Sequence, residues 1–385
     1  MSYSFDTFIT RENTHCYKYD LRETVFGNAN VLPMWVADMD FKIADEIIED
    51  ITTAVNHGIY GYTFHYDSVF DSFIRWQQKR HSWSIKKEDV LLFHGVVPSL
   101  NMIIQLFTNP GDEIIVQNPV YFPFFQSIEQ HSRVVVWNEL KKQEGTYTMN
   151  LESLKKSISN KTKMLFLCHP HNPVGRAWNK NELEELLAIC KQHNILVISD
   201  EIHADIMFGK KHIPWASLSE YAAQNSITLT APSKTFNIAG LNISAIITQN
   251  TLLNTTIKNY IKQNHLHGIN LLGLTAFESA YTKGETWLEE LLQYLTHNIE
   301  YIQDSLQNTP LTFTPPEATY LAWINFSALQ YSDAEIRNRL IEAGIGLNDG
   351  VSFGKGGEGY MRLNFACPLS TLKEGIQRIK KGFAL

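Results

Sequence analysis

The stretch "KMLFLCHPHNPVGRAWNKNELEELLAICKQHNILVISDEIH", residues 163–203, contains two apolar runs separated by a helical pattern. The runs at 163–168 and 195–199 have the length of strands and few polar interruptions, which is typical of strands buried on both faces. Between them an apolar side chain recurs at helical spacing, at Leu183, Leu186, Leu187 and Cys190. A strand, a helix and a second strand in this order predict a parallel sheet covered by helices.

The same alternation of apolar runs and helical segments extends along the chain in both directions. Further apolar runs of strand length stand at 89–93, 112–117, 133–137, 226–230 and 243–248, several with helix-like segments between them. Together with the first two runs they make seven strands. We therefore expect an α/β fold whose large domain is a mostly parallel seven-stranded sheet flanked by helices on both faces.

The pattern changes near residue 285. A long helical stretch is followed by a strand at 320–326, a helix at 333–344 and a strand at 360–366, which predicts a smaller α+β domain. A chain of 385 residues is longer than one hydrophobic core usually serves. The expected domains are 46–284 for the large one and 285–385 for the small one, which the N-terminal segment 1–45 joins.

Composition and charge narrow the class of protein. The chain is 44% hydrophobic and 19% charged, which is typical of a globular protein. The net charge of −7 and the shortness of the basic runs argue against a nucleic-acid partner, because phosphate binding needs clustered Lys and Arg. No apolar run approaches the ~18 residues that span a bilayer, and the first residues lack a signal-peptide pattern, so we expect a cytoplasmic protein without a membrane partner.

Cys168, His169 and His171 lie within four residues and raise the question of a metal site. On a strand, Cys168 and His169 point to opposite faces, and Pro170 interrupts regular pairing before His171. The sequence has neither a second ligand pair at a recognised zinc spacing nor an HExxH motif. We therefore expect no metal here. Cys168 is expected to end a buried strand, and the two histidines to shape the next turn or line a pocket wall.

Two other motifs are tested by their context. "GKGGEG" (354–359) fits GxGxxG, but the dinucleotide motif follows a strand and opens a helix, whereas this one runs into the predicted strand at 360–366. It is expected to be a turn. The sequence contains no GxSxG, so it gives no indication of a serine nucleophile.

Three strand-to-loop junctions carry groups that can bind a ligand. "HGVVPSL" (94–100) joins a strand to a helical segment, so its backbone N–H groups stand at a helix N-terminus and can bind an anion. Asp200 ends a strand at the carboxyl edge, where ligands of such sheets gather. Lys234, in "APSKTFNIAG" (231–240), lies among small and apolar residues, which favours the free amine needed for Schiff-base chemistry. Taken singly, these are also consistent with an ordinary turn, a helix cap and a surface lysine.

An anion anchor, an acid and an amine are together what a pyridoxal phosphate site requires. The order of "GYT", "HGVVPSL", "NPVY", "HNPVGR", "SDEIH", "APSKTFNIAG" and "YMRLNFA" resembles a class I/II aminotransferase-like enzyme of fold type I over essentially the full chain. Within that group, "PMWVADMDF" (33–41), "SDEIHAD" and "APSKTFNIAGL" resemble the MalY/PatB family of cystathionine β-lyases, or C–S lyases, more closely than true aminotransferases.

The resemblance implies pyridoxal 5'-phosphate as the cofactor and a role for each matching residue. Lys234 is expected to bond the cofactor's aldehyde and to be the catalytic group, and Asp200 to hold the pyridine nitrogen protonated. Tyr121 is expected to stack on the ring, although it would otherwise be interpreted as a core tyrosine. Asn172 is expected to bond the phenolic oxygen of the cofactor.

The phosphate and the partner subunit are assigned in the same way. The residues expected around the phosphate are Gly95, Val96, Val97 and Ser233. Tyr62 is expected to reach that phosphate from a second subunit, which implies a homodimer with its active site at the interface. Aminotransferases often have a hydroxyl or glycine three residues before the lysine and an arginine eight after it, whereas this chain has Ala231 and Asn242. The phosphate therefore has one cation fewer.

On the substrate side, Arg362 is expected to clamp the α-carboxylate with two hydrogen bonds. Without the resemblance it would be interpreted as a surface charge on a strand. Further contacts to the substrate are expected from Ala37, Tyr121 and Asn172. Where aminotransferases usually carry tyrosine three residues after the aspartate, this chain has His203, for which cofactor binding and simple packing both stay open.

The resemblance favours a β-lyase that cleaves cystathionine or a related S-substituted cysteine to a thiol such as homocysteine, pyruvate and ammonia, within amino-acid metabolism and methionine biosynthesis. The alternative is an aminotransferase, because both reactions use the same Lys234, Asp200 and Arg362. A third hypothesis is a cofactor-binding regulator without catalysis. The motifs themselves do not choose among these, and neither do they identify the substrate.

Overall fold

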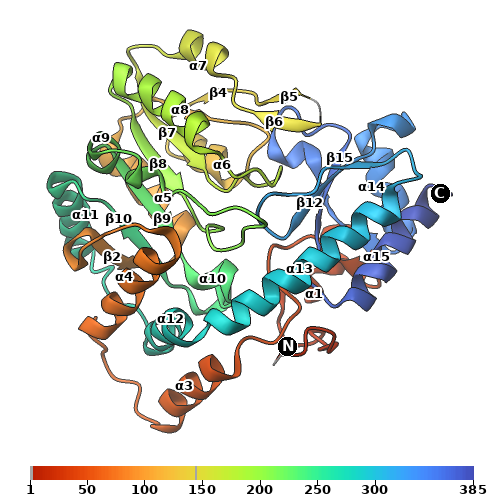
Figure 1. Cartoon of the computed structure of the whole chain (residues 1–385), viewed down its shortest axis with the longest axis horizontal. Coiled ribbons are helices and arrows are strands. Elements are labelled where there is room, and N and C mark those ends of the chain that lie inside the picture. The colour runs from red at the N-terminus through yellow and green to blue at the C-terminus, as the bar shows by residue number, and fades with distance from the viewer. Residues whose placement is uncertain (1–2, 144) are drawn as a thin grey trace.

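The computed structural model of the chain describes residues 3–143 and 145–385. Its main element is a seven-stranded sheet (Figure 1). In spatial order the strands are β2 (Val90–Phe93), β10 (Ser244–Ile247), β9 (Ser226–Thr230), β8 (Leu196–Asp200), β7 (Thr162–Cys168), β3 (Glu113–Val116) and β4 (Val134–Trp137). All neighbours are parallel except β10, which is antiparallel to both β2 and β9. The predicted seven strands and their mostly parallel arrangement are confirmed.

Alternation along the central strands explains why helices cover both faces. On β7, Met164 and Phe166 belong to the same core as the helix α5 (Val96–Phe107), whereas Leu165 and Leu167 pack with the helix α8 (Lys180–His193) on the other face. Successive side chains of a strand point to opposite faces, so a continuous apolar run needs a cover on each. The predicted helix is thus α8, which begins at a capping box between Asn179 and Glu182.

One expectation about the sheet is wrong. The apolar run at 133–137 suggested a strand buried on both faces, but β4 is the edge strand of the sheet. Its Val134 and Trp137 are 48% and 42% exposed. An apolar run records local composition only, and the position of a strand within the sheet is set by the order in which strands pair.

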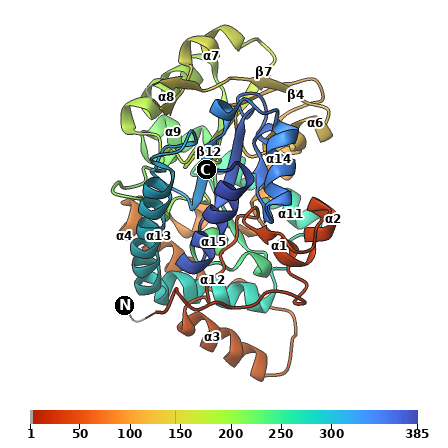
Figure 2. The same ribbon diagram turned by 90° about the vertical axis from the view of Figure 1, so that its right-hand side faces the viewer.

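A second, antiparallel sheet contains β11 (Thr312–Phe313), β12 (Leu321–Asn325), β15 (Tyr360–Asn364) and β14 (Asn348–Asp349), in that spatial order. The helices around it are α13 (Glu285–Leu306), α14 (Asp333–Glu342) and α15 (Leu369–Gly382). Figure 2 shows these helices on one side of the molecule, with α1 (Tyr17–Asp20) and α2 (Arg22–Phe26) beside them. The "GKGGEG" stretch is a turn that leads into β15, as predicted.

The N-terminal segment is tied to the second sheet region by β1 (Leu32–Pro33), which pairs in parallel with β13 (Ile345–Gly346). The remaining elements are α3 (Asp45–Asn56), α4 (Asp67–His81), α6 (Pro123–Gln130), β5 (Lys141–Gln143), β6 (Thr146–Thr148), α7 (Leu151–Ser157), α9 (Glu220–Gln224), α10 (Pro232–Thr235), α11 (Thr251–Gln263) and α12 (Leu271–Lys283). Among the described helices, none has both the length and the hydrophobicity to cross a membrane.

Candidate active site

A cavity of about 540 Å³ lies at the carboxyl edge of the large sheet and is lined by residues from both sheets. The predicted residues on its wall are Ala37, Gly95, Val96, Val97, Tyr121, Asn172, Asp200, His203, Ser233, Lys234 and Arg362. The fold thus brings together positions that are up to 325 residues apart in the chain, from Ala37 to Arg362. Tyr62 is not on this wall, and its side chain is fully exposed. Its predicted role at a second subunit stays a prediction.

Lys234 lies in the short helix α10, whose first residue is Pro232. Its Nζ donates a hydrogen bond to the carbonyl oxygen of Ala37 at 2.6 Å. The hydroxyl of Tyr320 donates to the same oxygen at 2.9 Å. Burial lowers the pKa of the Lys234 amine to about 8, because an ammonium loses its hydration in an apolar setting. About a tenth of this lysine is therefore the nucleophilic free amine at pH 7, far more than for a lysine with an ordinary pKa.

Asp200 is the last residue of β8 and is 5% exposed. One carboxylate oxygen accepts a hydrogen bond from the backbone N–H of Ile202 at 3.1 Å. Burial raises the pKa of this carboxyl to about 7, against the opposing effects of that hydrogen bond and of Lys234. A cationic ligand group at Asp200 would favour its ionised form, since an opposite charge stabilises the carboxylate.

The N-terminus of α5 forms another part of the wall. Gly95 precedes this helix with a φ of 133°, a conformation that L side chains rarely adopt. Its N–H donates to Ser244 Oγ at 3.1 Å, so this amide is already engaged within the protein. Within the described part of the chain, the amides of Val96 and Val97 meet no acceptor. Free amides at a helix N-terminus bind anions, and two of the three predicted amides are free to do so.

Arg362 and Asn172 meet across the cavity. Arg362, on β15, donates from Nη1 to Asn172 Oδ1 at 3.1 Å. Its Nη2 donates to the carbonyl of Trp35 at 2.8 Å and to Asn348 Oδ1 at 2.5 Å. Its Nε is buried and has no partner among the described residues. Burial lowers the pKa of this guanidinium to about 10, so Arg362 stays a cation with one donor still to be satisfied.

Tyr121 and His203 complete the wall. The ring of Tyr121 packs at 5.3 Å from that of Phe122, between ring centroids, so it belongs to the aromatic cluster and also lines the cavity. His203 is 3% exposed and lies 5.8 Å from the ring of Tyr320, again between centroids. Burial, with the nearby cations Lys234 and Arg362, lowers the pKa of His203 to about 3. His203 is therefore a neutral imidazole, and its buried Nδ1 lacks a partner among the described residues.

The histidines of "CHPH" have other partners. The Nε2 of His169 lies 3.0 Å from the carbonyl of Ile213, and that of His171 lies 2.9 Å from the carbonyl of Pro119. Neither residue lines the cavity, whereas Cys168 does. Over residues 3–143 and 145–385, no group of three His, Cys, Asp or Glu side chains is arranged to hold a metal ion. The two histidines fix the loop that carries Asn172.

Sequence reasoning assigned no role to three residues that hold the site's cations or their acceptor, two of which line the cavity. Trp35 and Asn348 hold the guanidinium of Arg362, and Tyr320 shares the Ala37 carbonyl with Lys234. Trp35 acts through its backbone, so its side-chain type carries no signal for this role. Asn348 lies opposite Arg362 on the neighbouring strand β14, a pairing that the sequence alone does not show. Only Tyr320, a buried tyrosine and the first residue of the strand predicted at 320–326, offered a usable signal.

Comparison with known proteins places this wall in a family. Residues 38–379 match the family described as aminotransferase class I and II. The chain belongs to this family. Cystathionine beta-lyase PatB of Bacillus subtilis is 42% identical over 382 residues, which cover 98% of this chain and 99% of that relative.

Solved structures of the family agree with the fold. A putative aminotransferase from Clostridium difficile 630, described as bound to PLP, superimposes with a TM-score of 0.97 at 42% identity and covers 99% of this chain and all of that one. Cystalysin from Treponema denticola, described as containing pyridoxal 5'-phosphate, superimposes with a TM-score of 0.96 at 35% identity and covers 100% and 99% of the two chains. The predicted fold type and family are confirmed.

Proposed function

We propose that this protein is a pyridoxal phosphate-dependent C–S β-lyase. It cleaves cystathionine or a related S-substituted cysteine, with consumption of one water molecule, to a thiol, pyruvate and ammonia. The observation that carries the proposal is the convergence of Lys234, Asp200 and Arg362 with the N-terminus of α5 on one cavity. The extensive likeness to a cystathionine beta-lyase supports elimination as the reaction.

The cavity fits pyridoxal phosphate group by group. The free amides of Val96 and Val97, with Ser233 beside them, suit the phosphate dianion. The buried carboxyl of Asp200 suits a protonated ring nitrogen, because that cation restores the carboxylate's charge partner. Tyr121 offers a ring to stack on, and Asn172 offers a donor to the phenolic oxygen. The cofactor satisfies buried groups that the protein leaves without partners.

When bound, pyridoxal phosphate supplies an electrophilic carbon for the substrate's amine and a conjugated ring that delocalises the electrons left on Cα. The protein's own residues do the rest. Arg362 binds the α-carboxylate with its positive charge and through Nε, the donor without a partner among the described residues, and so orients the Cα–H bond. Lys234, as a free amine, takes the α-proton and holds it on Nζ, where the Ala37 carbonyl accepts a hydrogen bond. The Cβ–S bond then breaks and the thiolate leaves.

An aminotransferase is the second candidate, favoured by the likeness to the putative aminotransferase from Clostridium difficile. In that reaction Lys234 would hand the proton taken from Cα on from Nζ with no bond to Cβ broken, and the amino group would pass to a keto acid. A cofactor-binding regulator is the third, and it is disfavoured because each group needed for proton transfer is present on the wall.

The deciding experiment is a substrate panel scored by pyruvate and by free thiol. The panel contains cystathionine, cysteine, S-alkyl cysteines and cysteinyl-glycine conjugates. We expect pyruvate and thiol in equal amounts from at least one S-substituted cysteine. Transfer of the amino group to a keto acid without any thiol would instead identify an aminotransferase, and no turnover of any substrate would favour the regulator.

We also propose a homodimer in which Tyr62 reaches the phosphate of the partner's cavity. The segment around Tyr62 supports this, because Ile59, Tyr60 and Phe64 are 70%, 61% and 77% exposed, and such apolar surfaces mark interfaces. The test mixes two inactive variants, Tyr62→Ala and Lys234→Ala, under subunit exchange. A hybrid dimer has one intact site of two. Because random exchange makes about half of the dimers hybrids, about a quarter of wild-type activity should return. No recovery in confirmed hybrids would contradict a shared site.

Three further expectations belong with this proposal. The domain boundary at 284/285 is supported by the ends of elements, since α12 ends at Lys283 and α13 begins at Glu285, whereas the boundary at 45/46 falls one residue inside α3. Limited proteolysis near residue 284 tests this division.

A cytoplasmic location fits four free cysteines, three of them buried, and fractionation of cells tests this location. A link to methionine biosynthesis requires homocysteine among the products of the panel.

A further inference from the structure

Residues 35–41, which we call the strap, contact both cations of the site through the backbone. The carbonyl of Trp35 accepts a hydrogen bond from Arg362 at 2.8 Å. Two residues later, the carbonyl of Ala37 accepts one from Lys234 at 2.6 Å. The position of the strap therefore sets where the amine of Lys234 rests.

Two asparagines hold the backbone of the strap. Asn237, three residues after Lys234, donates to the carbonyls of Met39 and Phe41, both at 3.0 Å, and accepts from the N–H of Met39 at 2.9 Å. Asn364 donates to the carbonyls of Val36 and Asp38 at 2.6 and 2.5 Å. The strap is thus fixed from the loop after α10, through Asn237, and from the second sheet, through Asn364 on β15.

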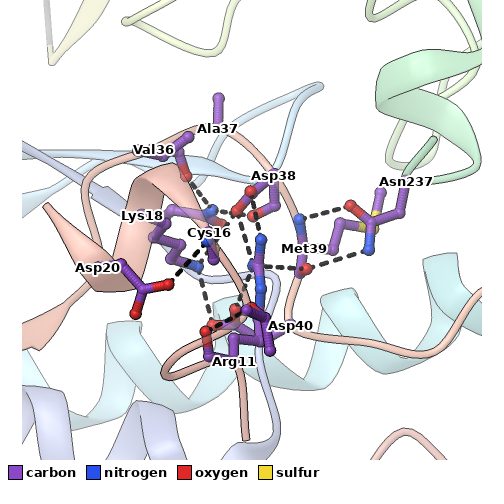
Figure 3. Close-up of polar contacts among 12 residues, drawn as sticks. Arg11, Cys16, Lys18, Asp20, Val36, Ala37, Asp38, Met39, Asp40 and Asn237 are labelled. Carbon is purple, nitrogen blue, oxygen red and sulfur yellow. Dashed lines mark hydrogen bonds and ion pairs between the residues drawn. The ribbon is translucent and has the colours of Figure 1, made fainter. Parts of the chain in front are cut away.

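An ion cluster fixes the side chains of the strap. Arg11 binds Asp38 at 2.6 Å and Asp40 at 2.7 Å, and Lys18 binds Asp40 at 2.8 Å and lies 3.7 Å from Asp38. Figure 3 shows Arg11 and Lys18 directed at the two carboxylates. Lys18 is 1% exposed and Asp40 7%, so the cluster is largely shielded from water. With two positive and two negative charges, it is formally neutral.

The charges that act on Lys234 come from several elements. Asp38 on the strap and Asp200 on β8 favour its ammonium form, and Arg362 on β15 opposes it. His203 faces it as a buried neutral ring, since the pKa of this imidazole lies near 3. Tyr320 competes for the Ala37 carbonyl. Of the two acids in the ion cluster, only Asp38 is next to Ala37 in the chain, and only Asp38 contributes to the pKa of Lys234.

We propose that Asp38 is a positioning residue for Lys234: held by Arg11 and Lys18, it fixes the Ala37 carbonyl as the acceptor for the lysine amine, and its carboxylate stabilises the ammonium. The inference rests on the proposed function, because that function requires Lys234 to carry a proton taken from the substrate. In this step one proton is transferred: the C–H bond at the substrate's Cα breaks and an N–H bond forms on Nζ of Lys234. A stronger negative charge at Asp38 keeps this proton on the lysine to higher pH.

The test compares Asp38→Asn with its matched control Asp40→Asn. Both changes remove one negative charge from the same cluster and leave the side chain's shape. The full chain is stripped of cofactor, and its rate of absorbance gain with added pyridoxal phosphate is measured between about pH 6 and pH 10. This rate follows the fraction of Lys234 present as free amine. We expect the midpoint of the Asp38→Asn variant to fall by about half a pH unit or more, and that of Asp40→Asn to fall by less than half as much.

Two further variants complete the set. Arg11→Gln leaves the cluster with a negative charge, so its midpoint should rise, and Asp38→Glu keeps the charge, so its midpoint should stay near that of wild type. Circular dichroism and the unfolding temperature check that each variant folds. If Asp38→Asn does not fold, Arg11→Gln decides, because Arg11 is partly exposed at 23%.

Each outcome has a meaning. Equal shifts in Asp38→Asn and Asp40→Asn, or no shift in either, overturn the role of Asp38, as does an Arg11→Gln midpoint that fails to rise when Arg11→Gln is the deciding variant. The measurement uses no amino-acid substrate, so it is independent of whether the enzyme is a lyase or an aminotransferase. A wild-type chain that gains no absorbance would instead overturn the proposed function, and this inference with it.

Discussion

Neighbouring strand ends in this protein carry buried titratable groups that differ in what they face. After β7, His169 and His171 direct Nε2 at backbone carbonyls. After β8 and β9, Asp200 and Lys234 line the cavity. Burial displaces the pKa in both regions, to about 3 for His169 and about 8 for Lys234. A displaced pKa therefore shows only that a group is buried. Such a group can take part in a reaction only if it also lines a cavity that a ligand can enter.

The largest expected effect comes from the cavity side. Lys234→Ala removes the one lysine amine that lines the cavity among the described residues, so kcat should fall by at least about 10³-fold. The absorbance of the covalently bound cofactor should disappear as well. Pyruvate assays and spectra measure both. The control is Lys283→Ala, a change of a lysine that pairs with Asp50 on the surface, and it should leave both unchanged. Substantial activity in Lys234→Ala would remove this lysine from the mechanism.

The next effect tests the substrate clamp. Arg362→Lys keeps a positive charge but cannot serve Asn172, Asn348, Trp35 and a carboxylate together, since an ammonium lacks the planar fork. We expect kcat/KM to fall by about 10- to 100-fold, mainly through KM, from the loss of charged hydrogen bonds. Arg378→Lys, on α15, should behave as wild type. A fall in kcat with KM unchanged would mean that Arg362 acts on chemistry instead of binding.

A smaller effect separates the cofactor from the substrate. Asn172→Ala should weaken cofactor binding by about tenfold, the equivalent of one hydrogen bond, and should shift the pH dependence of the cofactor's spectrum. Because Asn172 also accepts a hydrogen bond from Arg362, Arg362→Lys serves as the comparison. The spectrum without substrate should change in Asn172→Ala and stay the same in Arg362→Lys. Identical spectra in both variants would place Asn172 on the substrate side alone.

The smallest effect on activity is expected on the "CHPH" side. Burial, with the charge of His212, lowers the pKa of His169 to about 3, so between pH 6.5 and 3 the unfolded chain binds a proton that the folded chain does not. The contribution of His169 to the free energy of unfolding is therefore fully present above pH 6.5 and is lost as the pH falls below 6.5. Between pH 6.5 and 4.5, the free energy of unfolding should fall by about 2–3 kcal/mol less in His169→Gln than in the wild type. Urea unfolding at the two pH values measures it.

The matching controls examine function. Activity of His169→Gln should stay within about threefold of wild type, because a residue off the cavity affects only the loop beside it. His57 is exposed, so His57→Gln should leave the fall in the free energy of unfolding between the two pH values unchanged. Metal chelators should not affect the wild-type enzyme. Inactivation by a chelator would show that the histidine-rich loop has a function which its backbone partners do not explain.

The strands and the main site residues followed from the sequence because their causes are local. Apolar runs with helical segments between them specify buried parallel strands, and residues at the ends of such strands meet at one edge. Asp200 and Lys234 could therefore be placed by local pattern, and Arg362 by its motif. The edge position of β4 could not, since its apolar residues resemble those of a central strand and only pairing order distinguishes the two.

What the sequence by itself determined is which groups stand at the carboxyl edge of the sheet, because strand length, burial and strand ends are set by neighbouring residues. The tertiary structure alone decided what those groups touch. Arg362 meets the carbonyl of Trp35 across 327 positions, and Lys234 meets that of Ala37 across 197. Backbone carbonyls are the same in every residue type, so contacts of this kind leave no mark in the sequence and arise only when the two sheets and the strap pack together.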